Sequence, residues 1–474
     1  MSFAEYADYD AVGLAELVRK KEVTSAELVE AAIERIERHN GSLNAVVYKG
    51  YDEARANAAG ELPNGPFRGV PFLIKDLGQG VAGWPRTNGS RFTKDWVDET
   101  DTGIVPRFRQ AGLVFVGKTN TPEYGITGTS ESALLGPCRS PWNPAHISGG
   151  SSGGSASAVG AGIVPAAHAS DGLGSIRIPA ACCGLVGLKV TRHRNPAPPD
   201  RDIHALSVEH VVTRTVRDCA AMLDWTGVPD PVAPYPWPPK AGPYLDEVGR
   251  SPGRLRIAFS AETPAGRDIH PEVLAALHAT AELLERLGHE VFEQGLGIDY
   301  RALYRANRAP SGANFAAEMT RRIARNGREP EKDELEPLTW ASWRFGQKQT
   351  GEDVMRGLQD QREICRQILA FFDRVDVYLT PVMGTPPPPI GYIDPVRLEP
   401  REVNRRQGEA FPFTPPFNMT GQPSLSLPLA WSASGLPIGM MFSARYADEA
   451  TLFRLAAQLE KEAPWKVKRP MVWN

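Results

Sequence analysis

Amphipathic segments and short apolar runs alternate along the first half of the chain. The apolar residues of 24–39 recur at the spacing of one helix face, and Thr24 with Glu27 forms a capping box at the start, which predicts a helix there. Short apolar runs bounded by glycine, proline or polar turns follow, at 43–48, 71–74 and 113–116. Such alternation is typical of an α/β architecture with a largely buried sheet.

The second half begins with charged, helical patterns and returns to apolar runs near its end. Residues 271–289 and 353–373 have helical periodicity. The later runs predict two strands and a closing helix, at 424–429, 438–442 and about 448–461. We therefore predict a single domain, 1–474, with a core of residues 1–225 and 411–474 and a helical region at about 230–410 that covers the active site.

Composition narrows the class of protein without indicating a reaction. The 474 residues carry a formal net charge of -3, with 42% hydrophobic and 23% charged residues, and this balance favours neither nucleic acid nor a membrane surface as partner. The N-terminus lacks the pattern of a signal peptide, and no apolar run reaches the roughly 18 residues of a membrane span, so we expect a cytoplasmic protein. The five cysteines have no paired CxxC spacing, so we expect neither a disulfide framework nor a metal site, and no cofactor.

Several interpretations compete for the Gly/Ser tract at 148–154 (SGGSSGG). A flexible linker is the simplest, but the tract runs directly into the compact segment 170–190, and small residues in that context indicate close backbone approach. A phosphate-binding loop fails because Ser155 and Ala156 stand where that motif requires Lys and Ser or Thr. The GxSxG pattern at 149–153 matches a nucleophile elbow, but a loop-like segment precedes it and no downstream histidine has a recognisable context.

Taken together, the tract and six other segments resemble the amidase signature family. About two dozen residues on from the start of the tract comes 171–177 (DGLGSIR), and upstream of the tract lies 69–76 (GVPFLIKD), in the order and spacing of the family. Further matching segments are 117–123 (GKTNTPE), 141–144 (PWNP), 183–189 (CGLVGLK) and 417–423 (FNMTGQP). Because the resemblance spans nearly the whole chain, it implies the family's α/β/α fold, with a mixed central β-sheet surrounded by helices.

The resemblance implies serine catalysis without a histidine or a metal. By position it makes Ser175 the nucleophile, Ser151 the bridging serine after a cis peptide bond, and Lys75 the base. The chemistry agrees with this assignment. A serine hydroxyl needs a nearby base, a second hydroxyl can donate and accept a proton, and a lysine can serve as base when burial or neighbouring positive charge lowers its pKa.

The nucleophile segment also carries the implied oxyanion hole. It consists of backbone amides, those of Gly172, Leu173, Gly174 and Ser175. Leu173 stands where many members of the family have glycine, which leaves the amide in place but adds bulk near the pocket. Arg177 either pins this segment through hydrogen bonds, with Asp171 as an acceptor, or forms a surface ion pair.

The substrate class rests on the segment that matches the family's acyl pocket, Tyr124, Gly125, Ile126 and Thr127, which carries no charge. An uncharged pocket favours neutral, hydrophobic amides, anilides or carbamates, as in members that act on nylon oligomers, aryl amides or urethanes. The partners are then this small molecule and water, and the sequence also allows a homodimer. One alternative is a tRNA amidotransferase subunit that depends on partner proteins. The other is a catalytically silent binding protein, and the intact set of Lys75, Ser151 and Ser175 argues against that one.

Overall fold

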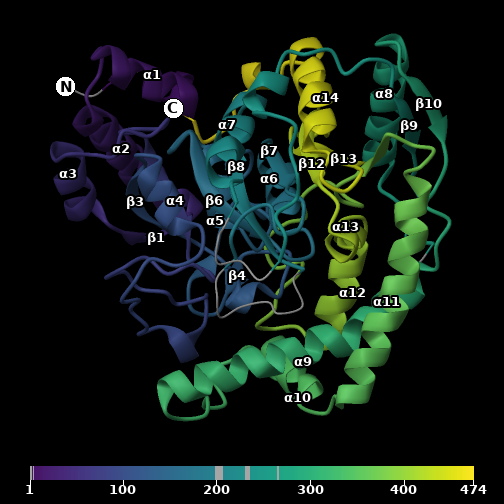
Figure 1. The fold of residues 1–474 in the computed structure, drawn as a ribbon. Coiled ribbons are helices and arrows are strands. Elements are labelled where there is room, and N and C mark those ends of the chain that lie inside the picture. The colour runs from purple at the N-terminus through teal and green to yellow at the C-terminus, as the bar shows by residue number, and fades with distance from the viewer. Residues whose placement is uncertain (1–2, 4, 198–205, 230–234, 264–265, 474) are drawn as a thin grey trace.

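The fold is built on one mixed β-sheet, whose strands come from both the first and the last parts of the chain (Figure 1). The computed structural model describes residues 3, 5–197, 206–229, 235–263 and 266–473. Its strands are β1 (Val46–Lys49), β2 (Pro71–Lys75), β3 (Val114–Thr119), β6 (Ala166–Asp171), β7 (Val186–Lys189), β8 (Val208–Thr213), β9 (Arg256–Phe259), β10 (Glu290–Glu293), β11 (Val377–Pro381), β12 (Ser424–Trp431) and β13 (Pro437–Ala444). β4 (Glu131–Ser132) and β5 (Gly136–Pro137) form a separate small hairpin.

The order across the sheet is β1-β3-β2-β6-β8-β7-β12-β13-β11-β9-β10. Strand β2 pairs in parallel with β3 and β6, and β9 pairs in parallel with β10 and β11. The other neighbours are antiparallel. The predicted mixed sheet among helices is therefore confirmed.

Helices surround this sheet. They are α1 (Ala11–Lys20), α2 (Ser25–Leu43), α3 (Tyr51–Ala59), α4 (Val105–Gln110), α5 (Gly153–Gly160), α6 (Arg177–Cys183), α7 (Val216–Thr226), α8 (Pro271–Arg286), α9 (Tyr300–Asn326), α10 (Pro337–Gly346), α11 (Gly351–Phe371), α12 (Pro400–Ala410), α13 (Pro415–Thr420) and α14 (Glu449–Glu462). Short 3₁₀ helices lie at Tyr6–Asp8, Arg91–Thr93, Glu123–Gly125, Leu245–Glu247 and Trp465–Val467. The predicted capping box forms, with the Glu27 amide donating to Thr24 Oγ1 at 3.2 Å, and the helix predicted there is α2.

The region 230–410, predicted as a helical cover, is only partly helical. It contains α8 to α12, and α9 packs against both α10 and α11 along the lower side of Figure 1. It also contributes β9, β10 and β11 to the main sheet, which the sequence patterns do not predict. The strands β9 and β10 have four residues each and flank α8, and runs this short give little periodicity to detect. The single domain stays a prediction.

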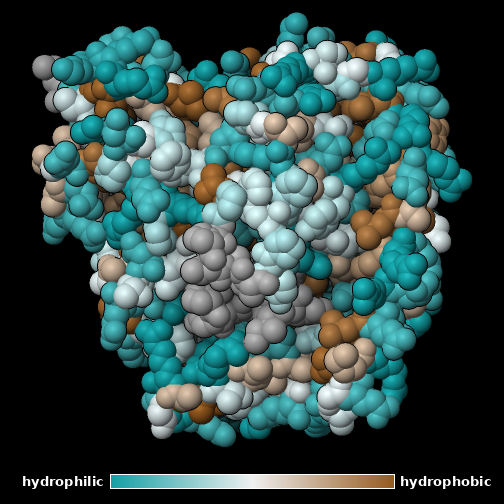
Figure 2. Space-filling view, viewed as in Figure 1, coloured by the Kyte–Doolittle hydropathy of each residue, from teal (hydrophilic) through white to brown (hydrophobic). Residues whose placement is uncertain are grey.

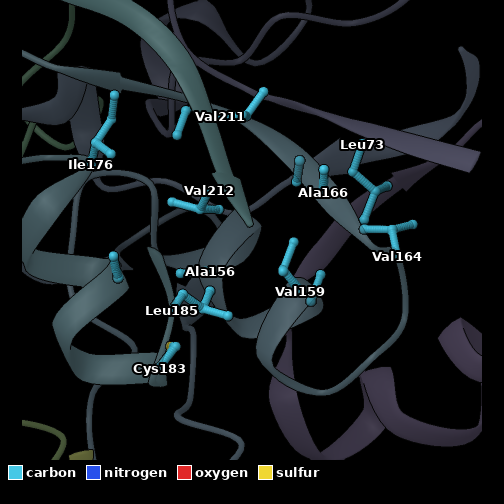
Figure 3. Close-up of a cluster of buried hydrophobic side chains, with 14 of the residues drawn as sticks. Leu73, Ala156, Val159, Val164, Ala166, Ile176, Cys183, Leu185, Val211 and Val212 are labelled. Atoms are coloured by element: carbon cyan, nitrogen blue, oxygen red, sulfur yellow. The ribbon is translucent and has the colours of Figure 1, made fainter. Parts of the chain in front are cut away.

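Small residues let the Gly/Ser tract enter the core. The helix α5, which begins in the tract, is buried along its whole length. Its Ala156 lies in one hydrophobic cluster with Leu73 of β2 and Val212 of β8 (Figure 3). A Cβ atom at Gly154 would lie 2.2 Å from the amide nitrogen of Asn120, so a side chain does not fit there. The tract is therefore a packing element and not a linker.

Hydrophilic side chains predominate on the face of the molecule shown in Figure 2, and the hydrophobic ones there are scattered. No helix in the described part of the chain is long and apolar enough to cross a membrane. All five cysteines are buried, and each is a free thiol.

Candidate active site

Lys75 and Ser151 meet at the end of β2. Lys75 is the last residue of this strand, and its side chain is completely buried. Its Nζ lies 2.7 Å from Ser151 Oγ and 3.0 Å from Ser170 Oγ. Ser170 comes from β6, which runs parallel to β2. The structure thus joins two of the three predicted catalytic residues at a distance suited to proton transfer and adds Ser170, which the sequence motifs do not single out.

The Gly/Ser tract fixes the position of Ser151. The peptide bond between Gly150 and Ser151 is cis, as the family resemblance implies. The carbonyl of Ser151 accepts a hydrogen bond from Thr121 Oγ1 at 2.9 Å, and Ser152 Oγ donates to the Ser170 carbonyl at 3.2 Å. These bonds attach the tract to the segment that follows β3 and to β6, the strand that leads into the loop of Ser175.

The predicted nucleophile, Ser175, lies in the loop between β6 and α6 and is half-buried. The Asp171 carboxylate organises this loop, because it accepts hydrogen bonds from the amides of Gly174 at 2.7 Å and Ile176 at 3.1 Å. Arg177 forms a bidentate ion pair with Asp171, with both nitrogen–oxygen distances 2.9 Å and both side chains fully buried. The pinning role of Arg177 is therefore confirmed over a surface ion pair.

The Asp171–Arg177 pair also joins the loop to α13. Asn418 Nδ2 donates to Asp171 Oδ1 at 2.9 Å, and Arg177 Nη1 donates to the carbonyl of Thr414 at 2.8 Å. Burial raises the pKa of Asp171, but the charge and hydrogen bonds of Arg177 and the Asn418 amide outweigh it and hold the pKa below its usual range. Asp171 is therefore a permanently charged anchor and is not available as a catalytic acid.

The four amides predicted as an oxyanion hole are not equivalent. The amide of Gly174 is occupied by Asp171, which removes it as an oxyanion donor in this structure. The amides of Gly172, Leu173 and Ser175 donate to no other group among the residues that the structure describes. Leu173 is 41% exposed, and its carbonyl accepts a hydrogen bond from Thr414 Oγ1 at 2.6 Å. The leucine that departs from the family pattern thus presents an apolar side chain beside the nucleophile.

The segment predicted to line the acyl pocket approaches Ser151 through one residue. A Cβ atom at Gly125 would lie 3.1 Å from Ser151 Oγ, so the glycine backbone is packed against the catalytic pair. Tyr124 is buried and packs on Phe315, with ring centroids 6.1 Å apart. Thr127 is also buried, and its hydroxyl donates to the carbonyl of Thr129. Ile126 is half-buried against the hydrophobic cluster that contains Tyr124.

A buried histidine supports the strand that carries Lys75. The amide of Lys75 donates to His168 Nδ1 at 3.3 Å, and His168 Nε2 lies 2.8 Å from Glu209 Oε2. Burial lowers the pKa of His168 more than the Glu209 carboxylate raises it, so the imidazole is neutral. Its Nδ1 accepts and its Nε2–H donates, and the ring connects β2 to β8 across β6. His168 and Glu209 carry no recognisable motif in the sequence.

The described residues contain no group of three or more His, Cys, Asp or Glu side chains that could hold a metal ion. The residues that the structure does place together are a buried lysine–serine pair and a rigid loop with a half-buried serine and amides free to donate. A buried base beside a serine, together with amides free to donate, is what a serine-dependent hydrolase of amide C–N bonds requires.

The chain belongs to the amidase signature family. Residues 27–453 match the family model described as Amidase. The 6-aminohexanoate-cyclic-dimer hydrolase of Paenarthrobacter ureafaciens is 36% identical over 481 residues, which cover 98% of this chain and 97% of that protein.

Two solved structures have the same fold. The structure of 6-aminohexanoate cyclic dimer hydrolase complexed with substrate has a TM-score of 0.92 and 34% identity, and it covers 99% of this chain and 100% of that one. A bacterial aryl acylamidase of the amidase signature family has a TM-score of 0.87 and 28% identity, with 97% of each chain covered. The predicted family, fold and enzyme class are confirmed.

Proposed function

We propose that the enzyme hydrolyses neutral, hydrophobic amides, anilides or carbamates through an acyl-enzyme formed on Ser175. The observation that carries this proposal is the 2.7 Å contact between Lys75 Nζ and Ser151 Oγ. This contact is buried, and the strand next to Lys75 leads directly into the loop of Ser175. A lysine–serine contact in this position supplies the base that a serine nucleophile needs.

In the proposed mechanism Ser175 Oγ attacks the carbonyl carbon of the amide. Its proton passes to Ser151 as the proton of Ser151 passes to Lys75. The amides of Gly172, Leu173 and Ser175 stabilise the negative oxygen of the tetrahedral intermediate. The proton then returns along the same path to the leaving nitrogen, and the C–N bond breaks. Water attacks the acyl-enzyme by the same route, which releases the acid and restores Ser175.

The surroundings of the nucleophile support an uncharged substrate. Leu173 exposes apolar surface beside Ser175, and the segment next to Ser151 contains no charged side chain. Apolar contacts of this kind orient hydrophobic groups and leave a charged group without a partner. The printed names of the relatives point to a cyclic amide dimer and to aryl amides as substrates of those proteins. Action on urethanes, the homodimer and the cytoplasmic location stay predictions.

A panel of substrates with matched variants tests the proposal. We would measure amine release from hydrophobic anilides, aryl carbamates and 6-aminohexanoate cyclic dimer, with wild type, Ser175→Ala and Ser434→Ala. Ser434 is an exposed serine in the turn between β12 and β13, so its removal controls for the substitution itself. We expect Ser434→Ala to match wild type and Ser175→Ala to lose roughly 10³-fold or more in kcat.

Incubation with a sulfonyl fluoride and intact-mass measurement would locate the covalent adduct. Labelling of wild type and Ser434→Ala but not of Ser175→Ala would support the acyl-enzyme. Amine release by Ser175→Ala at the wild-type rate would overturn it. No release by any folded variant would favour the partner-dependent amidotransferase subunit or the silent binding protein.

A further inference from the structure

A small pocket lies between the loop that follows Lys75 and the last turns of α9. Its volume is about 70 Å³, which is roughly the share of two liquid water molecules. The side chains that line it include Arg86, Asn88, Trp96, Arg321, Arg322 and Arg325. Most pockets for neutral ligands are apolar, whereas this one is dominated by guanidinium groups.

Positive charge exceeds negative charge around this pocket. Asp98 forms a bidentate ion pair with Arg86, at 2.8 and 2.9 Å, and it also receives Arg325 Nη1 at 3.4 Å. The other carboxylate, Glu318, accepts from Arg322 Nη2 at 2.8 Å. Arg86, Arg322 and Arg325 thus share two carboxylates, and with Arg321 also in the lining the positive side chains of the pocket outnumber the negative ones.

The residues that line the pocket include one unused donor and one weakly bonded donor. Arg322 Nη1 is buried and has no hydrogen-bond partner among the described residues. Asn88 Nδ2 reaches only the Arg86 carbonyl, at the long distance of 3.5 Å. A buried donor without an acceptor is unfavourable, and an anion would accept from Arg322 Nη1 and offer Asn88 Nδ2 a closer acceptor than the Arg86 carbonyl. The ring of Trp96, with Arg325 4.2 Å from its centroid, forms the apolar wall.

We propose that this pocket binds the carboxylate group of a small organic acid. A carboxylate has two oxygens for the space of about two waters, and guanidinium groups bind it through paired hydrogen bonds. The pocket adjoins the active site through one turn. Arg322 lies 4.3 Å from the centroid of the Tyr124 ring, the Tyr124 amide donates to the Asn88 carbonyl at 2.8 Å, and the next residue packs on Ser151.

Binding is tested without any amide substrate, so its outcome is independent of the proposed function. We would measure Tm as sodium acetate replaces sodium chloride at fixed ionic strength and pH. Matched titrations would use Arg322→Gln, Arg321→Gln and Arg305→Gln. Arg305 is also on α9 but forms an exposed ion pair with Asp299 outside this pocket, and exposed Arg321 gives a second variant that should fold.

We expect the Tm of wild type and Arg305→Gln to rise with acetate and to saturate, as a ligand that binds only the native state requires. The concentration for half the effect should increase at least fivefold in Arg321→Gln and Arg322→Gln. An equal response of all four proteins would overturn the proposal. A larger, saturating response to inorganic phosphate than to acetate would also overturn it, because the site would then prefer a tetrahedral anion.

Discussion

At the scale of single residues, the position of the Lys75–Ser151 pair depends on neighbours that leave it almost no free space. Gly125 has a φ of 72°, and its backbone fits between Leu77 and Ser151. A Cβ atom there would lie 2.6 Å from Leu77 Cδ2 and 3.1 Å from Ser151 Oγ. A side chain there must therefore displace Leu77 Cδ2 and press on the Ser151 hydroxyl that contacts Lys75.

Gly125→Ala is expected to lower kcat by at least tenfold, because a shift of Ser151 lengthens its contact with Lys75. Gly288→Ala is the matched control, since Gly288 has a φ of 91° and nothing within 4 Å of its Cβ position. Both variants should lose about 1 kcal/mol of stability from the strained φ. Steady-state kinetics and thermal melts would separate the effects, and an equal loss of activity in both would contradict the steric explanation.

The family resemblance predicts Lys75 and Ser151 as partners, but it does not predict the residues that support them. Ser170 and His168 reach Lys75 only because β6 lies beside β2, two strands separated by about ninety residues of sequence. Neither residue type is unusual on a buried strand, so nothing local marks them. The sequence also does not predict that the Gly174 amide is already bonded. That bond depends on the conformation of the Asp171 side chain, which accepts it.

At the scale of elements, α10 is held to the core by two buried carboxyl groups. The Glu336 amide, at the start of α10, donates to Glu123 Oε2 at 2.8 Å, and the Ala133 amide donates to Glu336 Oε1 at 2.8 Å. Ser90 Oγ donates to the other oxygen of Glu123 at 2.7 Å. Burial, and then the neighbouring Glu123, raise the pKa of Glu336 to about 8, so this carboxyl is protonated at neutral pH.

The raised pKa predicts how stability changes with pH. Between the ordinary value of 4.5 and about 8, the folded chain holds a proton on Glu336 that the unfolded chain releases, so stability falls as pH rises through this interval. Glu336→Gln removes the titration and keeps an acceptor for Ala133. We expect it to be more stable than wild type by roughly 1–3 kcal/mol at pH 9 and by progressively less toward pH 5.

Urea denaturation at several pH values would measure this difference. Glu329→Gln, at an exposed position before α10, is the matched control and should differ from wild type by the same small amount at every pH. A Glu336→Gln variant that differs from wild type equally at pH 5 and pH 9 would show that its effect is packing and not titration.

The amphipathic helices were predictable because caps and periodicity are local properties. The helix predicted at 353–373 is α11, with a capping box formed by Thr350 and Asp353 that fixes its start. The strands β9 and β10 were not predictable, because each has four residues and is a strand only through pairing with its neighbours. A short strand is stabilised mainly by pairing with its neighbours in the sheet, and no single segment of sequence determines which strands become neighbours.

At the scale of the whole molecule, residues near both ends of the chain pack around the turn that follows α5, an arrangement called the closure below. Both ends lie on the same side of the molecule (Figure 1). Tyr6 Oη donates to the Ile163 carbonyl at 3.1 Å. Arg35 Nη2 donates both to the Ala161 carbonyl at 2.8 Å and to the Trp473 carbonyl at 2.7 Å. Since α5 begins in the tract that carries Ser151, contacts among distant parts of the chain hold the far end of the catalytic tract.

Trp473 is the main hydrophobic group in this closure. Its ring is nearly buried, with Arg35 5.5 Å and Arg469 4.1 Å from its centroid, and a Cβ atom at Gly162 would lie 2.9 Å from it. Trp473→Ala should cost about 3 kcal/mol of stability, through lost burial and the loss of its three cation–π contacts, with Arg35, Arg214 and Arg469. Met471→Ala, at a position that is 74% exposed two residues earlier, should change stability by less than about 0.5 kcal/mol.

Hydrogen exchange would show whether the closure stabilises the tract or only the chain end. If the ends support α5, Trp473→Ala will speed exchange of the amides of α5 as well as those of the C-terminus, and Met471→Ala will not. Faster exchange confined to the last residues would mean that α5 keeps its position without the closure. In that case kcat at a temperature well below Tm should be the same in both variants, whereas a loosened α5 predicts a lower kcat for Trp473→Ala alone.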